Sequence, residues 1–111
     1  MNYNSKYKTI YYFSYKNDMK KEDYDFLKKE FINKAFDYGC INFDYYHQEG
    51  KNSCYNYVGM GNWNSIEDAQ KFETYLKDKK KEFSKYYAKY PKVEYYSYKE
   101  HYEGKSHKKT A

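Results

Sequence analysis

The sequence predicts an α+β domain in which two helices cover one face of a four-stranded antiparallel sheet. Three observations predict this class. Four Tyr-rich segments have the composition or alternation of strands, two stretches between them repeat apolar residues every three or four positions, and the segments follow one another in the order β-α-β-β-α-β. This order is the ferredoxin-like arrangement, in which the first and third strands are central.

The first third of the chain predicts a central strand followed by a long helix. Residues 8–16 are rich in Tyr, Ile and Thr on both faces, as in a strand that is covered on both sides. Asn17 and Asp18 are placed to cap the helix. Its apolar stripe consists of Tyr24, Leu27, Phe31, Ala35 and Tyr38. We expect Gly39 to end it.

A hairpin is expected next. Residues 40–48 alternate apolar and polar side chains, residues 49–53 have turn composition, and residues 54–63 supply the third strand. Ser65 and Asp68 then form a start signal for a second helix. The apolar stripe of this helix consists of Ile66, Ala69, Phe72 and Leu76.

The C-terminal part predicts a broken helix and a last strand. The lysine run 79–81 indicates a bend, after which the helical pattern resumes until Pro91 ends it. Residues 92–102 then form the last strand. We expect one domain over residues 1–103, and a flexible C-terminal tail over residues 104–111.

The core of this domain is expected to be aromatic. The 111 residues include 19 Tyr and 7 Phe but few aliphatic side chains. The sheet face away from the helices is also rich in Tyr and Phe in the predicted register. Because a monomer rarely exposes so large an apolar face, two sheets are expected to pair face to face in a homodimer.

Charge and hydropathy exclude several classes. The chain has 21 Lys, no Arg and 16 acidic residues, for a net charge of +5. Nucleic-acid binding usually uses Arg for bidentate hydrogen bonds to phosphates and base edges, so no nucleic-acid partner is expected. No run reaches the roughly 18 apolar residues of a membrane span, and the N-terminus lacks an apolar signal core. A cytoplasmic location is therefore expected, with Cys40 and Cys54 both free.

The predicted hairpin and second helix carry a family resemblance. Gly39 and Cys40 open the second strand, Trp63 and Ser65 stand where the third strand becomes a helix, and "YPKVEYYSY" closes the domain. With Glu67, Ala69 and Phe72, these positions resemble the antibiotic biosynthesis monooxygenase family of the dimeric α+β barrel superfamily. The resemblance covers roughly residues 8–98.

The resemblance implies a pocket between helices and sheet that works without a cofactor. Some members of the family oxidise polycyclic phenols or quinols with O₂ and no metal or flavin, and others degrade haem. The haem-degrading members use a His on the helix after the Trp and an Asn on the first strand. Neither is present at these positions here, which argues against haem degradation, and no metal or other cofactor is expected.

The pocket, if present, is expected beside Trp63. Tyr57, Gly59, Gly61 and Trp63 share one face of the third strand, and Asn62 lies on the other. A flat aromatic ligand could lie over the two glycines, with Trp63 and Asn62 as candidate catalytic residues. Alternatively, Trp63 is a core anchor and the glycines mark a bulge, which is the commoner role of a lone Trp.

Two functions from different classes follow. The first is a cofactor-independent monooxygenase that acts on a quinol-like or anthrone-like substrate, in which Trp63 forms an aromatic wall and Asn62 or a Tyr hydroxyl stabilises the developing charge. The second is a non-catalytic dimeric barrel that binds a small ligand or a protein partner. His47 and Cys54 form a weaker candidate pair for an activated thiolate, unless they belong to a solvated hairpin tip.

Overall fold

The predicted order of strands and helices is confirmed. The computed structural model describes residues 6–49 and 56–104. The elements are β1 (Tyr7–Tyr15), α1 (Lys21–Asp37), β2 (Asn42–His47), β3 (Tyr57–Trp63), α2 (Ile66–Asp78), α3 (Lys80–Phe83), the 3₁₀ turn η1 (Ser84–Tyr86) and β4 (Tyr87–Ser97). Residues 50–53 of the predicted turn, Cys54 and residues 105–111 lie outside the described residues.

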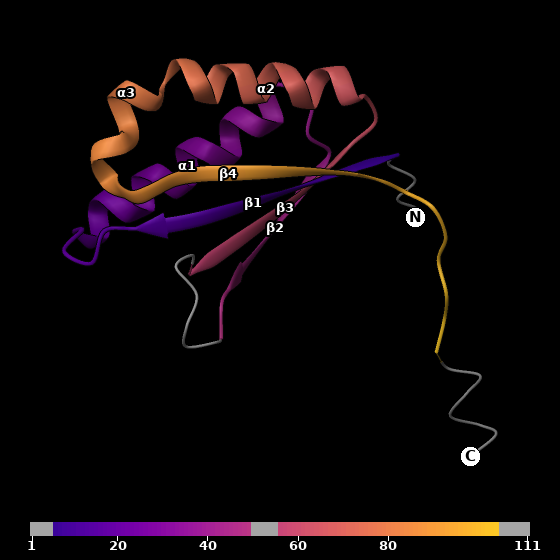
Figure 1. The fold of residues 1–111 in the computed structure, drawn as a ribbon, viewed down its shortest axis with the longest axis horizontal. Coiled ribbons are helices and arrows are strands. Elements are labelled where there is room, and N and C mark those ends of the chain that lie inside the picture. Colours follow the sequence, from indigo (N-terminus) through magenta and orange to yellow (C-terminus); the bar gives the residue numbers. More distant parts are fainter. Residues whose placement is uncertain (1–5, 50–55, 105–111) are drawn as a thin grey trace.

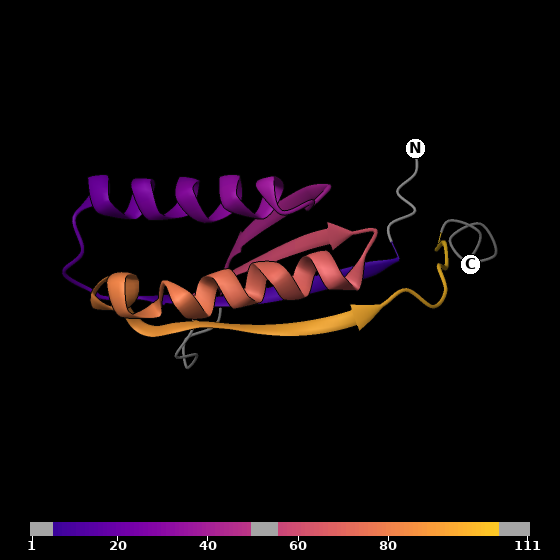
Figure 2. The same ribbon diagram turned by 90° about the horizontal axis from the view of Figure 1, so that it is seen from above.

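The four strands form one antiparallel sheet in the order β2-β3-β1-β4. β1 and β3 are central, as predicted. Figures 1 and 2 show α1 and α2 lying side by side on one face of this sheet. The architecture is the ferredoxin-like α+β fold, and none of the helices in residues 6–49 and 56–104 covers the second face of the sheet. We call this second face the open face.

The helix boundaries match the sequence signals at three of four ends. Gly39 has a φ of 111°, a left-handed conformation that suits glycine and ends α1. The Ser65 hydroxyl accepts the Asp68 amide N–H at 3.3 Å and caps α2. α2 ends at Asp78, where the predicted break begins.

The predicted cap of α1 was wrong. The helix begins at Lys21, and its N-cap, Lys20, makes no side-chain capping bond. The Met19 amide N–H donates to the Lys16 carbonyl, and this closes a turn that holds Asn17 and Asp18 ahead of the helix. Their side chains therefore do not reach its first free N–H groups.

The predicted position of the last strand was also wrong. β4 begins at Tyr87 and ends at Ser97, so Pro91 lies inside the strand instead of ending a helix. β4 is an edge strand, where a residue without an N–H is tolerated. The Tyr90 hydroxyl donates to the Leu76 carbonyl at 2.7 Å and ties the start of this strand to α2.

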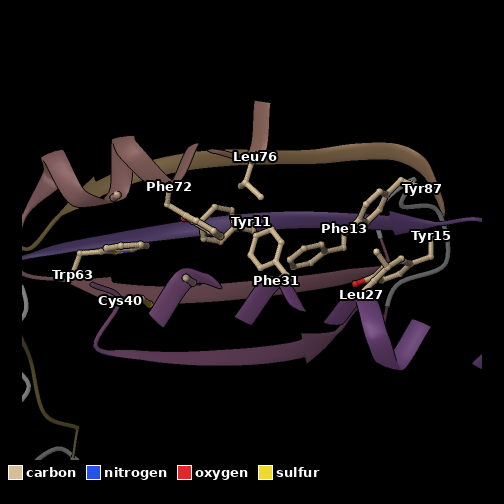
Figure 3. Packing of buried hydrophobic residues seen from close by; sticks show 12 residues of the cluster. Tyr11, Phe13, Tyr15, Leu27, Phe31, Cys40, Trp63, Phe72, Leu76 and Tyr87 are labelled. Atoms are coloured by element: carbon tan, nitrogen blue, oxygen red, sulfur yellow. The ribbon is translucent and has the colours of Figure 1, made fainter. Parts of the chain in front are cut away.

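The core between helices and sheet is aromatic, as predicted. Figure 3 shows Tyr11, Phe13 and Tyr15 from β1 in one cluster with Phe31 of α1 and Phe72 of α2. The ring of Phe31 meets those of Tyr11 and Phe13 edge to face, with centroids 5.1 and 4.9 Å apart. Such contacts add to the free energy of burial and fix the ring orientations.

The open face is less aromatic than predicted. The strand register places Ile10, Val58 and Met60 near its centre, all partly buried. Its tyrosines are Tyr12, Tyr46 and Tyr96, and in the described strands it carries no Phe or Trp. The face is therefore a mixed apolar and polar surface.

Candidate functional site

Trp63 lies inside the core, between the sheet and α2. Its side chain is 0% exposed, and its indole N–H donates to the Thr9 hydroxyl at 2.8 Å. Figure 3 shows Trp63 beside Phe72, and the two ring centroids lie 6.1 Å apart. These are the contacts expected of a core anchor at the corner where β3 becomes a helix.

Other side chains occupy the space over the two glycines of β3. A Cβ atom added to Gly59 would come within 2.5 Å of the Phe43 ring. One added to Gly61 would meet the Cys40 sulfur at 3.0 Å and the Trp63 indole nitrogen at 3.2 Å. The glycines thus let neighbouring side chains approach the strand closely. A flat ligand can lie here only if Phe43 or Cys40 moves.

The structure separates Asn62 from the other predicted site residues. Tyr57, Gly59, Gly61 and Trp63 face the helices, and Asn62 projects from the open face, because neighbouring residues of a strand point to opposite sides. Its side-chain amide donates to the side-chain oxygen of Asn42 on β2 at 2.5 Å. Asn62 and Trp63 therefore do not line one pocket.

A hollow of about 650 Å³ lies at the Asn62 end of the open face. This volume falls within the range of small-molecule sites, and it exceeds the hollows of about 400 and 320 Å³ elsewhere on the chain. The hollow is lined by Tyr7, Lys8, Asn42, Asp44, Asn62, Tyr96, Ser97, Tyr98 and His101. It is the candidate functional site.

The hollow combines a polar floor with aromatic walls. In the strand register Lys8 lies opposite Asn62 on one side and Asn42 lies opposite Asn62 on the other, and Asp44 is two residues further along β2. Tyr96 of β4 and Tyr98, just after the strand, contribute rings. Amide and ammonium groups donate hydrogen bonds, and rings provide flat apolar contacts. The arrangement suits a planar molecule with a polar edge.

A second polar cluster borders the hollow. Glu94 accepts hydrogen bonds from the hydroxyls of Tyr12 at 2.7 Å and Tyr96 at 2.9 Å. These bonds, with the nearby Lys92 ammonium, lower the pKa of Glu94 below its usual range. They also raise the pKa values of both tyrosines, so Tyr96 keeps its proton and stays a hydrogen-bond donor at neutral pH.

Sequence reasoning missed most of the hollow. Lys8, Asn42 and Tyr96 were assigned to strands but to no site. One signal was available, because the hairpin register pairs Asn42 with Asn62. Two asparagines directly opposite on a sheet surface indicate a side-chain amide pair. The contribution of Tyr98 and His101 depends on how the chain leaves β4, which no local pattern specifies.

The helix side holds one polar group without a partner. The Tyr11 hydroxyl is buried and has no hydrogen-bond partner among the described residues. Burial raises the pKa of Tyr11 above its usual range. This phenol therefore stays neutral.

The weaker candidate pair, His47 and Cys54, falls only partly within the described residues, and the other thiol, Cys40, is not placed for nucleophilic chemistry. Cys40 is buried, and burial raises the pKa of its thiol to about 11, which makes it a poor nucleophile. His47 contacts the Tyr57 ring with centroids 5.0 Å apart. Its predicted partner, Cys54, lies outside the described residues. Residues 6–49 and 56–104 contain no cluster of three His, Cys, Asp or Glu side chains arranged to hold a metal.

The fold is shared with several solved structures. A hydroxynitrile lyase from Passiflora edulis is 15% identical over 89% of this chain and 98% of its own, with a TM-score of 0.68. A candidate antibiotic biosynthesis monooxygenase from Nitrosomonas europaea is 20% identical over 83% and 97%, with a TM-score of 0.58. A dimeric ferredoxin-like protein from Thermobifida fusca is 7% identical over 88% and 96%, with a TM-score of 0.60.

These likenesses confirm the predicted fold and include the family that the sequence resembles. Their names differ in reaction, so the fold by itself does not fix the chemistry. No protein-family model matches the chain, and the comparison with curated proteins finds no match. Within the described part of the chain, no helix is both long and apolar enough to cross a membrane.

Proposed function

We propose that the chain forms a homodimeric α+β barrel that binds a small planar molecule with a polar edge in the open-face hollow. The observation that carries this proposal is the hollow itself, which the Asn42–Asn62 amide pair lines together with Lys8, Asp44, Tyr96 and Tyr98. The polar groups would orient the ligand and the rings would contact its faces.

The homodimer is supported by the composition of the open face and by a relative of the same fold. Ile10, Val58 and Met60 lie near the centre of a sheet face that no helix covers. Pairing two such faces would bury these side chains. The neighbour from Thermobifida fusca is described as dimeric, which favours the same assembly here. A second copy would also cover the hollow and reduce its contact with water.

A second candidate function is cofactor-independent oxygenation of a quinol or anthrone in the same hollow. The name of the Nitrosomonas europaea neighbour favours it, as does the pair of donors, Lys8 and Asn62, which suit a phenolate. In this reaction the ionised substrate reduces O₂ directly. An anthrone CH₂ group becomes a carbonyl, one oxygen atom enters the product and the other leaves as water. The protein would stabilise the anion and exclude water.

Binding is tested with a panel of anthrones, quinols and quinones by isothermal titration calorimetry. Asn62→Ala is expected to weaken binding about tenfold, since it removes one hydrogen bond to the ligand and the partner of Asn42. Asn64→Ala is the matched control, because Asn64 is exposed and lies outside the hollow. An unchanged affinity in Asn62→Ala would contradict the site.

Oxygenation of the substrate and formation of the dimer are tested by two separate measurements. O₂ consumption on re-aeration of an anaerobic mixture of protein and anthrone distinguishes turnover from binding alone. Light scattering after size exclusion tests the dimer, and a mass near 13.7 kDa at micromolar concentration would contradict it. The cytoplasmic location stays a prediction.

A further inference from the structure

Residues 98–104 leave the sheet after β4 and run away from the helices, on the side of the open face (Figure 1). The Tyr98 amide N–H donates to the Lys6 carbonyl at 2.9 Å, and this bond fixes the point of departure. Every residue from 98 to 104 is exposed. We call these seven residues the C-terminal segment.

Two aromatic rings of the C-terminal segment lie in solvent. Tyr98 is 62% exposed and Tyr102 is 80% exposed. Several polar side chains of the segment are already paired with one another, because the Tyr102 hydroxyl donates to Glu100 and the His101 ring lies 2.5 Å from Glu103. The groups with most to gain from a binding partner are therefore the two rings.

The C-terminal segment is long enough to reach a second copy of the chain. Two sheets that pack face to face lie about 10 Å apart. Seven residues in extended conformation reach about 23 Å. A segment that starts at the edge of the open face and runs away from the helices is thus long enough to cross the space between two paired sheets.

We infer that residues 98–104 of each chain lie against the partner subunit of the homodimer, with Tyr98 and Tyr102 as the anchoring side chains. This inference rests on the proposed homodimer. It adds a contact beyond the paired sheets, and it places the wall of the hollow formed by Tyr98 and His101 at the subunit interface. The partner is a second copy of this chain.

The test compares single substitutions in the 111-residue chain. Tyr102→Ser is expected to raise the dimer dissociation constant about tenfold, as loss of a buried interface aromatic does. The matched control is Phe26→Ser, because Phe26 is 55% exposed but lies on α1, away from the open face. Phe26→Ser is expected to leave the constant unchanged. Sedimentation velocity over a dilution series measures all three proteins, and circular dichroism checks their folding.

A photocrosslinking residue at position 102 gives an independent readout. We expect a crosslinked product of twice the chain mass, with the crosslink joining position 102 to the other subunit. A dimeric wild type whose dissociation constant is the same in Tyr102→Ser, or crosslinks confined to one chain, would overturn the inference and leave the homodimer standing. A monomeric wild type would overturn both.

Discussion

The two faces of the sheet use neighbouring residues of the same strands for different purposes. On the helix side, β3 presents Gly59, Gly61 and Trp63 to a core in which rings fill the space. On the open side, the same strand presents Val58, Met60 and Asn62 to a surface with a hollow of about 650 Å³. The helix side has a void between α1, α2 and β4, but its volume is only about 20 Å³. This is room for about one water molecule.

This difference shows that small residues beside a Trp do not by themselves indicate a cavity. Glycines open space next to a strand, but the Phe43 ring and the Cys40 thiol use that space. The hollow forms instead where side chains of moderate size surround a surface that no helix covers. The helix side is therefore expected to respond to substitution mainly in stability, and the open side mainly in binding and assembly.

The largest expected effect separates Trp63 from its neighbour Asn62. Trp63→Ala is expected to lower the free energy of unfolding by about 3 to 5 kcal/mol, because it leaves a large cavity and removes the donor to Thr9. Asn62→Ala is expected to cost less than about 1 kcal/mol. Urea unfolding of both variants measures the difference. If both variants lost the same free energy of unfolding, Trp63 would not be a core residue with Asn62 at the surface, and the division of the two faces would be wrong.

A smaller effect is expected from filling the space at Gly61. Gly61→Val is expected to cost about 1 to 3 kcal/mol, because the added atoms meet Cys40, Thr9 and Trp63. Met60→Val, one residue away on the open face, is the control and is expected to cost less than about 1.5 kcal/mol. Ligand affinity is expected to survive Gly61→Val in a folded dimer. Loss of binding there would instead favour a ligand site on the helix side.

The free energy of unfolding is expected to fall at alkaline pH because the Cys40 thiol is buried. Burial raises the pKa of this thiol from 9.0 to about 11. Below pH 9 the thiol keeps its proton in both states, so it adds no pH dependence. Between about pH 9 and 11 only the unfolded chain releases the proton, so stability falls as pH rises, by an amount on the order of 2 kcal/mol.

Cys40→Ala provides the control for this pH dependence. This substitution removes the part of the stability loss at high pH that comes from the thiol. The part that comes from the buried tyrosines remains, because burial also raises their pKa values. Urea midpoints measured at several pH values between 8 and 11 compare the two proteins. Parallel curves would show that Cys40 is not buried in the folded chain.

The smallest effect concerns Glu94 on the open face. Hydrogen bonds from Tyr12 and Tyr96 lower its pKa, so Tyr12→Phe combined with Tyr96→Phe is expected to return that pKa toward its usual value, with little change in stability. Carboxyl carbon shifts followed by nuclear magnetic resonance measure the titration. A pKa that is the same in both proteins would contradict this hydrogen-bond cluster.

Sequence alone determined the order of the elements and the residues of the core. The periods of three and four in α1 and α2 selected Leu27, Phe31, Phe72 and Leu76, and all four are buried. The local start and stop signals at Ser65 and Gly39 were also sufficient, because a helix cap depends on the few residues that make it. The caps rest on contacts between residues close together in the chain, and the apolar periods rest on the local geometry of a helix.

Only the tertiary structure decided how the end of the chain pairs and where space is left. Pro91 reads locally as a helix breaker, yet an edge position beside β1 makes it part of a strand. Trp63 and the two glycines suggested a cavity, yet Phe43 and Cys40, which come from another strand and from the end of α1, fill that space. Free volume depends on all the side chains that converge on one place. They come from distant parts of the chain, so no local pattern could specify whether the place is filled or empty.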